Sequence, residues 1–262
     1  KLTARVAAFV LLILPGVAPA PAGQQIPDIP DTAEVLARVR KALGHERMAR
    51  YEHGYVLEGR AVSSGVRSHA RLMFAPDGRF AVAIDGPLGQ AAVFDGRKGW
   101  ARDMSGISRP LQFEDLEEQQ MLVWVSTGRW LAGDGSFVLE VDPSNTDEKR
   151  VALRVTLGKG VRGLLQVNRA DWRPAFMTYG SSSGEYRLEF DDYRRQNGFW
   201  FPFELRHVHN GMTDHYEFEA LRPAGAKEAQ EFARPPQALS RARFDANVSP
   251  RLETMRARTG HI

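Results

Sequence analysis

Apolar and polar residues alternate with a period of two over most of the chain after Tyr55. In the run 79–85, Phe80, Val82 and Ile84 fall on one face, opposite charged or small neighbours. Alternation of this kind is typical of strands with one buried face. Short sequences rich in Gly, Pro, Asn and Asp separate the runs, as they do in hairpins. The pattern predicts about eleven or twelve antiparallel strands, arranged as meanders.

Two segments have helical spacing instead. Residues 31–44 begin with Asp31, which suits an N-cap, and end at Gly44, which suits a C-terminal stop. Residues 113–128 begin with acidic side chains, which favour a helix N-terminus, and continue into the apolar run 121–125. Five consecutive apolar residues cannot all face one core stripe. We therefore expect a mainly β (α+β) fold, a curled antiparallel half-barrel with helices over its opening.

The concave side of this half-barrel is expected to be rich in aromatic residues. Strand parity places Phe199, Phe201, Phe203 and Leu205 on one face and Trp200 on the other. A large antiparallel barrel often encloses a ligand cavity, and the helices would then form a lid over it. The same aromatic residues could equally fill the core by themselves. The pattern alone leaves both interpretations open.

The two ends of the chain differ from its middle. Residues 1–22 have a basic start, a short apolar run and small residues before Gly23, which predict a secretory signal peptide. Residues 23–221 carry the strand pattern. Residues 222–262 are rich in Ala, Arg and Pro, and we interpret them as a linker or extension that packs weakly, leading to a further domain absent from this chain. We expect the protein to be periplasmic or otherwise exported.

The amino-acid composition excludes several classes of function. The chain has no cysteine, which excludes disulfides, thiolate catalysis and cysteine-ligated zinc. Residues 222–262 have a net charge of +4 and residues 23–221 a net charge of −3, so no basic face for nucleic acid is expected. The apolar run in residues 1–22 is too short for a transmembrane helix. We predict no cofactor.

Two short motifs match catalytic or cofactor signatures, but their contexts disagree. Residues 180–184 satisfy G-x-S-x-G around Ser182, and residues 158–163 satisfy G-x-G-x-x-G. Both signatures require a helix immediately afterwards, whereas strand-like alternation follows each of them here. We interpret both as hairpin turns. Neither a serine nucleophile nor a dinucleotide site is predicted.

Histidines near a predicted hairpin form a weak candidate for a metal site. His207 and His209 lie two apart on one strand and share a face, and His215 lies across the turn 210–211, next to Asp214. Two histidines and a third ligand suit zinc or copper. Polar residues beside a hairpin tip are usually solvated, and that interpretation is preferred. We therefore assign no metal.

Residues 31–221 contain segments that resemble the periplasmic lipoprotein-carrier superfamily with the LolA/LolB-like fold. The resemblance depends on the leading helix TAEVLARVRKALG, the hairpin FAPDGRFAVAID, VFDGRKGWARD, a mid-chain helix ending in GRWL, and the closing run from Glu189 to Leu221. It implies an unclosed β-barrel with a helical lid and a hydrophobic interior that accepts acyl chains. These segments are markers of a fold, and none is a catalytic signature. The lipobox cysteine of lipid-anchored relatives is absent.

The resemblance and the pattern together predict a non-enzymatic domain that binds an acyl chain, a lipid or a lipidated peptide, such as a lipoprotein. The expected cavity wall consists of Phe80, Val82, Ile84, Phe199, Phe201, Phe203 and Leu205, and the expected lid of Met121, Leu122, Trp124 and Val125. Residues 244–262 resemble the segment before a retropepsin-like aspartyl protease domain. The alternative function is therefore an accessory, protein-interaction domain of a longer exported protease.

Overall fold

The first half of the sheet is a six-stranded meander in which each strand pairs with the next. In this computed structural model, residues 29–233 and 236 are described, apart from 87–88, 104, 159–160, 182–183 and 210. Consecutive strands pair antiparallel throughout this meander. Its strands are β1 (Tyr55–Ser63), β2 (Val66–Phe74), β3 (Phe80–Asp85), β4 (Gln90–Phe94), β5 (Gly99–Arg102) and β6 (Ser108–Leu111).

The second half is a seven-stranded meander whose last strand joins the first half. Strand β13 pairs with β1, so the sheet order runs β6 to β1 and then β13 to β7, with β6 and β7 at opposite edges. The 13 strands form one antiparallel sheet that does not close, which confirms the predicted fold class. The strands are β7 (Phe137–Val141), β8 (Arg150–Leu157), β9 (Val161–Asn168), β10 (Pro174–Ser181), β11 (Gly184–Gln196), β12 (Phe199–His209) and β13 (Met212–Pro223).

One helix connects the two edges of the sheet. Strands β6 and β7 are consecutive along the chain but lie at opposite edges, so the segment between them has to cross the full width of the sheet. Helix α3 (Phe113–Ser126) makes this crossing on the concave side, followed by the short helix η1 (Arg129–Leu131). A helix in this position contacts apolar residues on more than one side, which explains its run of consecutive apolar residues.

Helix α1 (Thr32–Leu43) begins and ends as its sequence predicts. The Asp31 carboxylate accepts a hydrogen bond from the Glu34 backbone N–H at 2.7 Å, and Gly44 ends the helix with a positive φ of 71°. Val35 and Val39 are fully buried on its inner face. Helix α2 (His45–Met48) follows directly, and both helices contact β12 at one end of the half-barrel.

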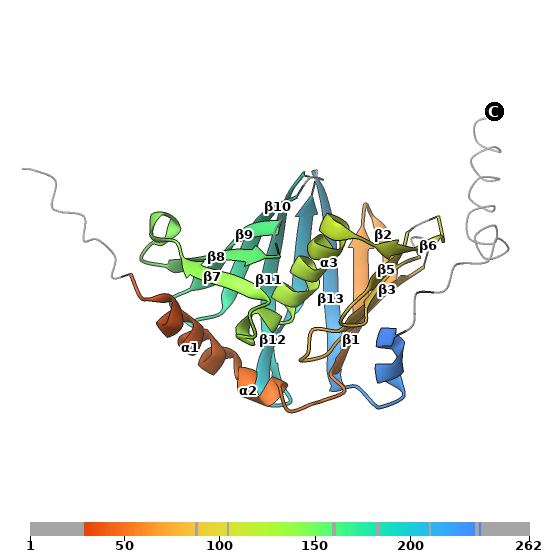
Figure 1. The fold of residues 1–262 in the computed structure, drawn as a ribbon, viewed down its shortest axis with the longest axis horizontal. Coiled ribbons are helices and arrows are strands. Elements are labelled where there is room, and N and C mark those ends of the chain that lie inside the picture. Colours follow the sequence, from red (N-terminus) through yellow and green to blue (C-terminus); the bar gives the residue numbers. More distant parts are fainter. Residues whose placement is uncertain are drawn as a thin grey trace, which may run out of the picture.

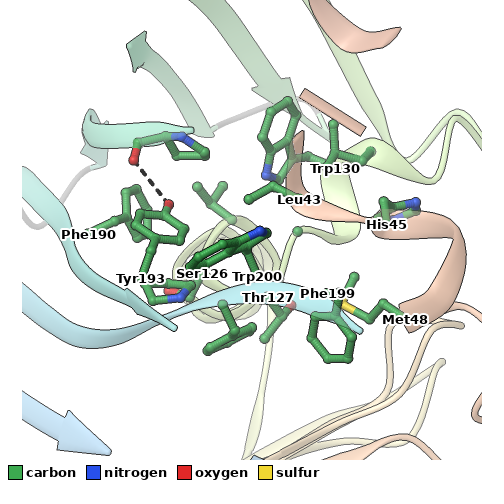
Figure 2. A pocket seen from close by; sticks show the side chains of 16 residues that line it. Leu43, His45, Met48, Ser126, Thr127, Trp130, Phe190, Tyr193, Phe199 and Trp200 are labelled. Atoms are coloured by element: carbon green, nitrogen blue, oxygen red, sulfur yellow. Dashed lines mark hydrogen bonds between the residues drawn. The ribbon is translucent and has the colours of Figure 1, made fainter. Parts of the chain in front are cut away.

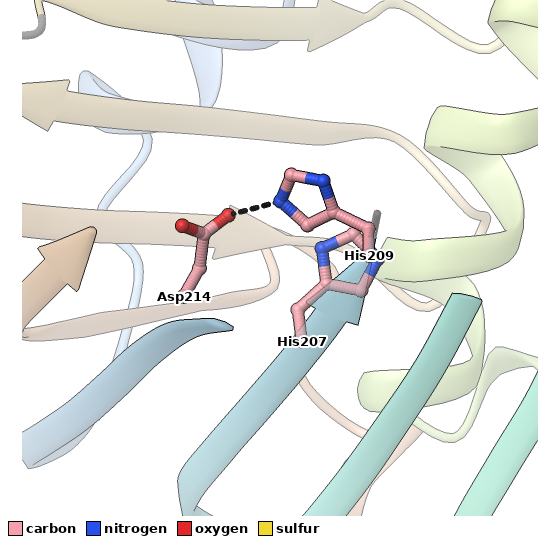
Figure 3. A group of neighbouring side chains, drawn as sticks. All are labelled: His207, His209 and Asp214. Atoms are coloured by element: carbon pink, nitrogen blue, oxygen red, sulfur yellow. Dashed lines mark hydrogen bonds and ion pairs between the residues drawn. The ribbon is translucent and has the colours of Figure 1, made fainter. Parts of the chain in front are cut away.

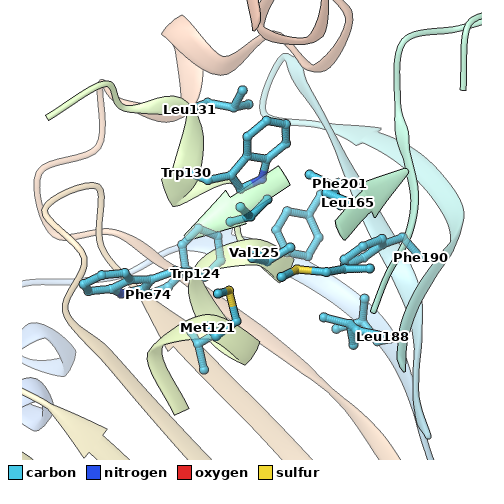
Figure 4. Packing of buried hydrophobic residues seen from close by; sticks show 14 of the residues in the cluster. Phe74, Met121, Trp124, Val125, Trp130, Leu131, Leu165, Leu188, Phe190 and Phe201 are labelled. Atoms are coloured by element: carbon cyan, nitrogen blue, oxygen red, sulfur yellow. The ribbon is translucent and has the colours of Figure 1, made fainter. Parts of the chain in front are cut away.

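The concave face holds the main hydrophobic core. Phe199 packs edge-on against Tyr55 at 5.0 Å between ring centroids, and Phe201 stacks on Phe74 at 5.6 Å. Both contacts cross from β12 to the meander β1–β2, and rings at these separations attract each other beyond simple burial. Figure 4 shows the part of the core around α3, where Met121, Trp124 and Val125 pack against sheet residues.

The chain after β13 packs firmly on the convex face, contrary to the weakly packed extension that we expected after residue 221. Helix η3 (Glu228–Ala233) places Phe232, which has 0% exposure, in a second cluster with Val56, Met73 and Ala75. The Arg71 guanidinium group forms ion pairs with Glu228 at 3.2 Å and with Glu231 at 2.5 Å. Composition misled the prediction, because one aromatic residue and a few charges suffice to dock a short segment. The residues beyond 236 lie outside the described part.

Replacing Phe232 by alanine is expected to lower the free energy of unfolding by about 3 kcal/mol, because a fully buried ring is lost. Hydrogen exchange of residues 224–233 should accelerate, since η3 loses its apolar anchor. Phe113→Ala is the matched control, because this phenylalanine is 87% exposed. Urea denaturation of both variants tests the expectation. If Phe232→Ala lost no more stability than Phe113→Ala, the packing of Phe232 on the sheet would not contribute to the free energy of unfolding.

Candidate functional site

The floor of the candidate site is the apolar concave face beneath α3. Cross-strand register aligns Val82 with Leu72, and Leu205 with Phe190 on one side and Tyr216 on the other. Directly paired residues of neighbouring strands point to the same side of the sheet, and Val82, Leu205 and Tyr216 line one cleft. The site is therefore assembled from both meanders, across the junction between β1 and β13.

Trp124 contacts both meanders of the sheet, at β4 in the first and at β7 in the second. Its ring lies 5.9 Å from that of Phe94 in β4 and 5.8 Å from that of Phe137 in β7, edge-on to both. Its indole Nε1 donates a buried hydrogen bond of 2.7 Å to the Gly78 carbonyl in the β2–β3 turn. Trp124, a residue of the predicted lid, therefore contacts both meanders, and its indole N–H has a buried hydrogen-bond acceptor.

The two halves of α3 are held very differently. Residues 120–127 are buried except for Leu122, whereas none of residues 113–119 is buried and Phe113 is 87% exposed. In the N-terminal half, Leu116 packs against the core while only partly buried, and polar contacts such as the exposed ion pair between Asp115 and Arg109 at 3.3 Å add to it. No side chain caps the helix N-terminus at Gln112. The C-terminal half is the anchored end, and the N-terminal half has much less apolar area to lose on moving away.

An apolar cleft of about 60 Å³ separates α3 from the floor. Leu122 and Val123 line it from the helix, and Val82, Leu188 and Leu205 line it from the sheet. An apolar cavity of about 150 Å³ binds benzene, and this cleft has less than half that volume, so it is too small for an acyl chain while α3 is in place. It shows where the helix and the floor are not in full contact.

Other hollows fit an apolar ligand less well. The space between α1, α2 and β12 measures only about 20 Å³, because Trp130, Phe199 and Trp200 fill it (Figure 2). A hollow of about 160 Å³ lies between α2 and the β2–β3 turn, but Arg129 and His45 line it. Charged and polar groups favour water there. The cleft beneath α3 is therefore the candidate site.

The predicted wall and lid residues occupy different parts of the concave side. Val82, Leu205 and Leu122 line the cleft. Ile84 packs nearby with Ala61 and Ala70. The remaining predicted residues are buried in the main core, namely Phe80, Phe199, Phe201, Phe203, Met121, Trp124 and Val125.

Several cleft-lining residues were absent from the prediction. Leu72, Leu188, Tyr216 and Phe218 line the cleft and come from β2, β11 and β13. Each lies in a run with period-two alternation, so its face was readable from the sequence. Its neighbours across the sheet were not readable, because they depend on strand order.

A polar and aromatic group lies at the end of the concave face towards the β12–β13 turn. The Tyr179 hydroxyl and His207 Nε2 are 3.0 Å apart, and the His207 ring stacks on Tyr186 at 5.4 Å. Burial, together with the nearby His209, lowers the pKa of His207 to about 4, so the imidazole is neutral at neutral pH. Burial also raises the pKa of Tyr179. His209 Nε2 lies 3.0 Å from Asp214 Oδ2.

His215, a candidate third partner of His207 and His209 from the sequence, does not join this group. It lies on the opposite face of β13, where its Nε2 is 3.0 Å from Glu204. The two-residue turn 210–211 aligns His207 with Asp214, and His215 with Arg206. That register was available from the sequence, because a two-residue turn fixes every pair along its hairpin.

The two signature motifs lie in hairpins, as their contexts predicted. Residues 180–184 run from the end of β10 to the first residue of β11, and residues 158–163 run from the end of β8 into the start of β9. Each glycine motif therefore leads into a strand. Ser182 lies outside the described residues.

The fold of this chain is similar to that of known proteins, whereas its sequence matches none of those compared. No family model matches the sequence, and no curated protein matches it. A DUF1329 family protein from Desulfovibrio piger is 12% identical with a TM-score of 0.50, over 76% of this chain and 94% of that one. A domain from Vibrio parahaemolyticus, named for outer membrane lipoprotein sorting, is also 12% identical with a TM-score of 0.50, over 82% and 98%.

A LolA superfamily protein from Nitrosomonas europaea is 15% identical with a TM-score of 0.49, over 75% of this chain and 94% of that one. At such identities, structural likeness concerns the fold and carries no function by itself. The resemblance to a protease lead-in gains no support, and residues 244–262 are outside the described part. The described chain, an unclosed antiparallel barrel crossed by one helix, therefore shares its fold with the proteins from Desulfovibrio piger and Vibrio parahaemolyticus.

Proposed function

We propose that this protein is an exported, non-enzymatic carrier that binds an acyl chain or a lipid between α3 and the concave sheet. The observation that carries the proposal is an apolar cleft beneath Leu122, Val123 and Ser126 of α3, next to an N-terminal half of the same helix in which no residue is buried. A ligand would displace the N-terminal half while Trp124 keeps the C-terminal half in place. The LolA-like fold supports a lipid-binding or carrier role.

The energetics suit binding without chemistry. Burial of an acyl chain contributes about 0.8 kcal/mol for each CH₂ group, so about ten groups supply roughly 8 kcal/mol before the cost of moving the helix. Phe113, at the N-terminal end of α3, adds exposed apolar surface. The ligand class is therefore an amphiphile with at least one long alkyl chain.

Localisation and partners follow from the same proposal. No helix in the described part of the chain is both long and apolar enough to cross a bilayer. The proposed signal peptide, residues 1–22, lies outside the described residues. We propose a periplasmic protein that exchanges its lipid, or the acyl group of a lipoprotein, with other partners.

The test is uptake of palmitate by the delipidated, tag-free chain, followed by native mass spectrometry. Val82→Asp places a carboxylate in the cleft, which an acyl chain would have to desolvate, and uptake should fall at least tenfold. Val138→Asp is the matched control, because Val138 is 59% exposed on β7. Circular dichroism confirms that both variants fold. If wild type takes up no palmitate, or both variants bind it equally, the cleft is not the binding site.

A further inference from the structure

The β12–β13 hairpin brings three metal-ligating side chains together on the concave face. His207 and His209 are two residues apart on β12, so their side chains share that face. Asp214 is the cross-strand partner of His207 on β13. Directly opposed residues in an antiparallel pair have closely spaced Cβ atoms. The backbone therefore holds the three side chains near one another, whatever their rotamers.

The ligating atoms are already close to the spacing that one ion requires. One nitrogen of each histidine and one Asp214 oxygen all lie within 4.8 Å of one another, and His209 Nε2 is 3.0 Å from Asp214 Oδ2 (Figure 3). Zinc bonds nitrogen and oxygen at about 2.0–2.2 Å, which puts two ligand atoms of a tetrahedron about 3.3 Å apart. Small side-chain rotations suffice to bring this group to that spacing.

Neighbouring residues orient the group and leave it accessible. The Tyr179 hydroxyl lies 3.0 Å from His207 Nε2, and stacking on Tyr186 holds the plane of the His207 ring. Ligating histidines commonly have an outer partner of this kind. The His207 residue has 8% exposure, while the side chains of His209 and Asp214 have 21% and 18%, so an ion can enter from the solvent side.

We propose that His207, His209 and Asp214 bind a single zinc ion, with water or an anionic group in the remaining coordination position. Two imidazoles and one carboxylate are a donor set that zinc favours, and an incomplete protein shell leaves a position open. This site is independent of the acyl-chain proposal, because the chain-binding cleft and the zinc ligands are different residues.

His215 provides a matched control within the same hairpin. It is adjacent to Asp214 in sequence and lies 3.0 Å from Glu204 and 3.8 Å from Glu217. It therefore has carboxylate neighbours like those of the proposed ligands, but it lies on the opposite face. Any general affinity of histidines and carboxylates for zinc would appear at both places.

Isothermal titration of the EDTA-treated, tag-free chain with zinc chloride tests the proposal. The expected result is one ion for each chain, a raised melting temperature with zinc, and affinity at least tenfold weaker in His209→Gln and in Asp214→Asn. His215→Gln should bind as wild type does. Asp214→Asn keeps a hydrogen-bonding side chain, so its fold can be verified without metal. Absence of binding at 100 μM zinc, or equal weakening in His215→Gln, overturns the site.

Discussion

A variant in which an engineered disulfide links α3 to the sheet is expected to take up no fatty acid. Leu116 lies in the loosely held half of α3, and a Cβ atom at position 99 in β5 would be 2.6 Å from its Cδ1 atom. Gly99 has no positive φ, so cysteine fits its backbone. The double variant Gly99→Cys/Leu116→Cys should form a disulfide, since the chain has no other cysteine to compete.

The same variant provides its own control. Oxidised protein should show at least a tenfold loss of palmitate uptake in native mass spectrometry, because the bond prevents the N-terminal half of α3 from moving. Added dithiothreitol should restore uptake to the level of the two single variants, and thiol titration reports the state of the bond. Equal uptake by oxidised and reduced protein would show that α3 does not control access to the cleft.

Local patterns predicted most of the individual elements of this fold. Alternation in β3 and the caps of α1 are properties of a few adjacent residues, and both appear in the structure as expected. Strand β6 was missed because it is short, contains Pro110 and lies at an edge, where proline is tolerated. Pairing of β1 with β13 joins residues more than 150 positions apart, and no local pattern contains that information.

The candidate site shows the limit of strand parity. Alternation places a side chain on a face, but it does not determine whether that side chain borders an opening or packs in the core. Phe201 and Leu205 share the concave face, yet Phe201 stacks on Phe74 while Leu205 borders the cleft. That difference depends on the position where α3 crosses. The crossing is fixed by strand order and by the contacts of Trp124, which lie far apart in the sequence.

The junction of the two meanders makes Gly59 a position at which a methyl group should be severely destabilising. Gly59 lies at a bulge in β1, an interior strand that pairs with both β2 and β13. A Cβ atom there would lie 2.1 Å from the Glu217 carbonyl oxygen and 2.6 Å from the Phe218 Cα atom. Both are backbone atoms of β13, so a side-chain rotation cannot relieve the overlap.

Gly59→Ala should therefore lower the free energy of unfolding by at least about 3 kcal/mol, a large share of the total for a domain of this size. The melting temperature should fall by about 6–12 °C. Gly180→Ala is the control, because a Cβ atom at that strand position meets nothing within 4 Å. It should be neutral or slightly stabilising, since alanine restricts the unfolded chain. A Gly59→Ala protein as stable as the control would mean that β1 and β13 are not paired in this register. The two halves of the concave floor would then not share one face beneath α3.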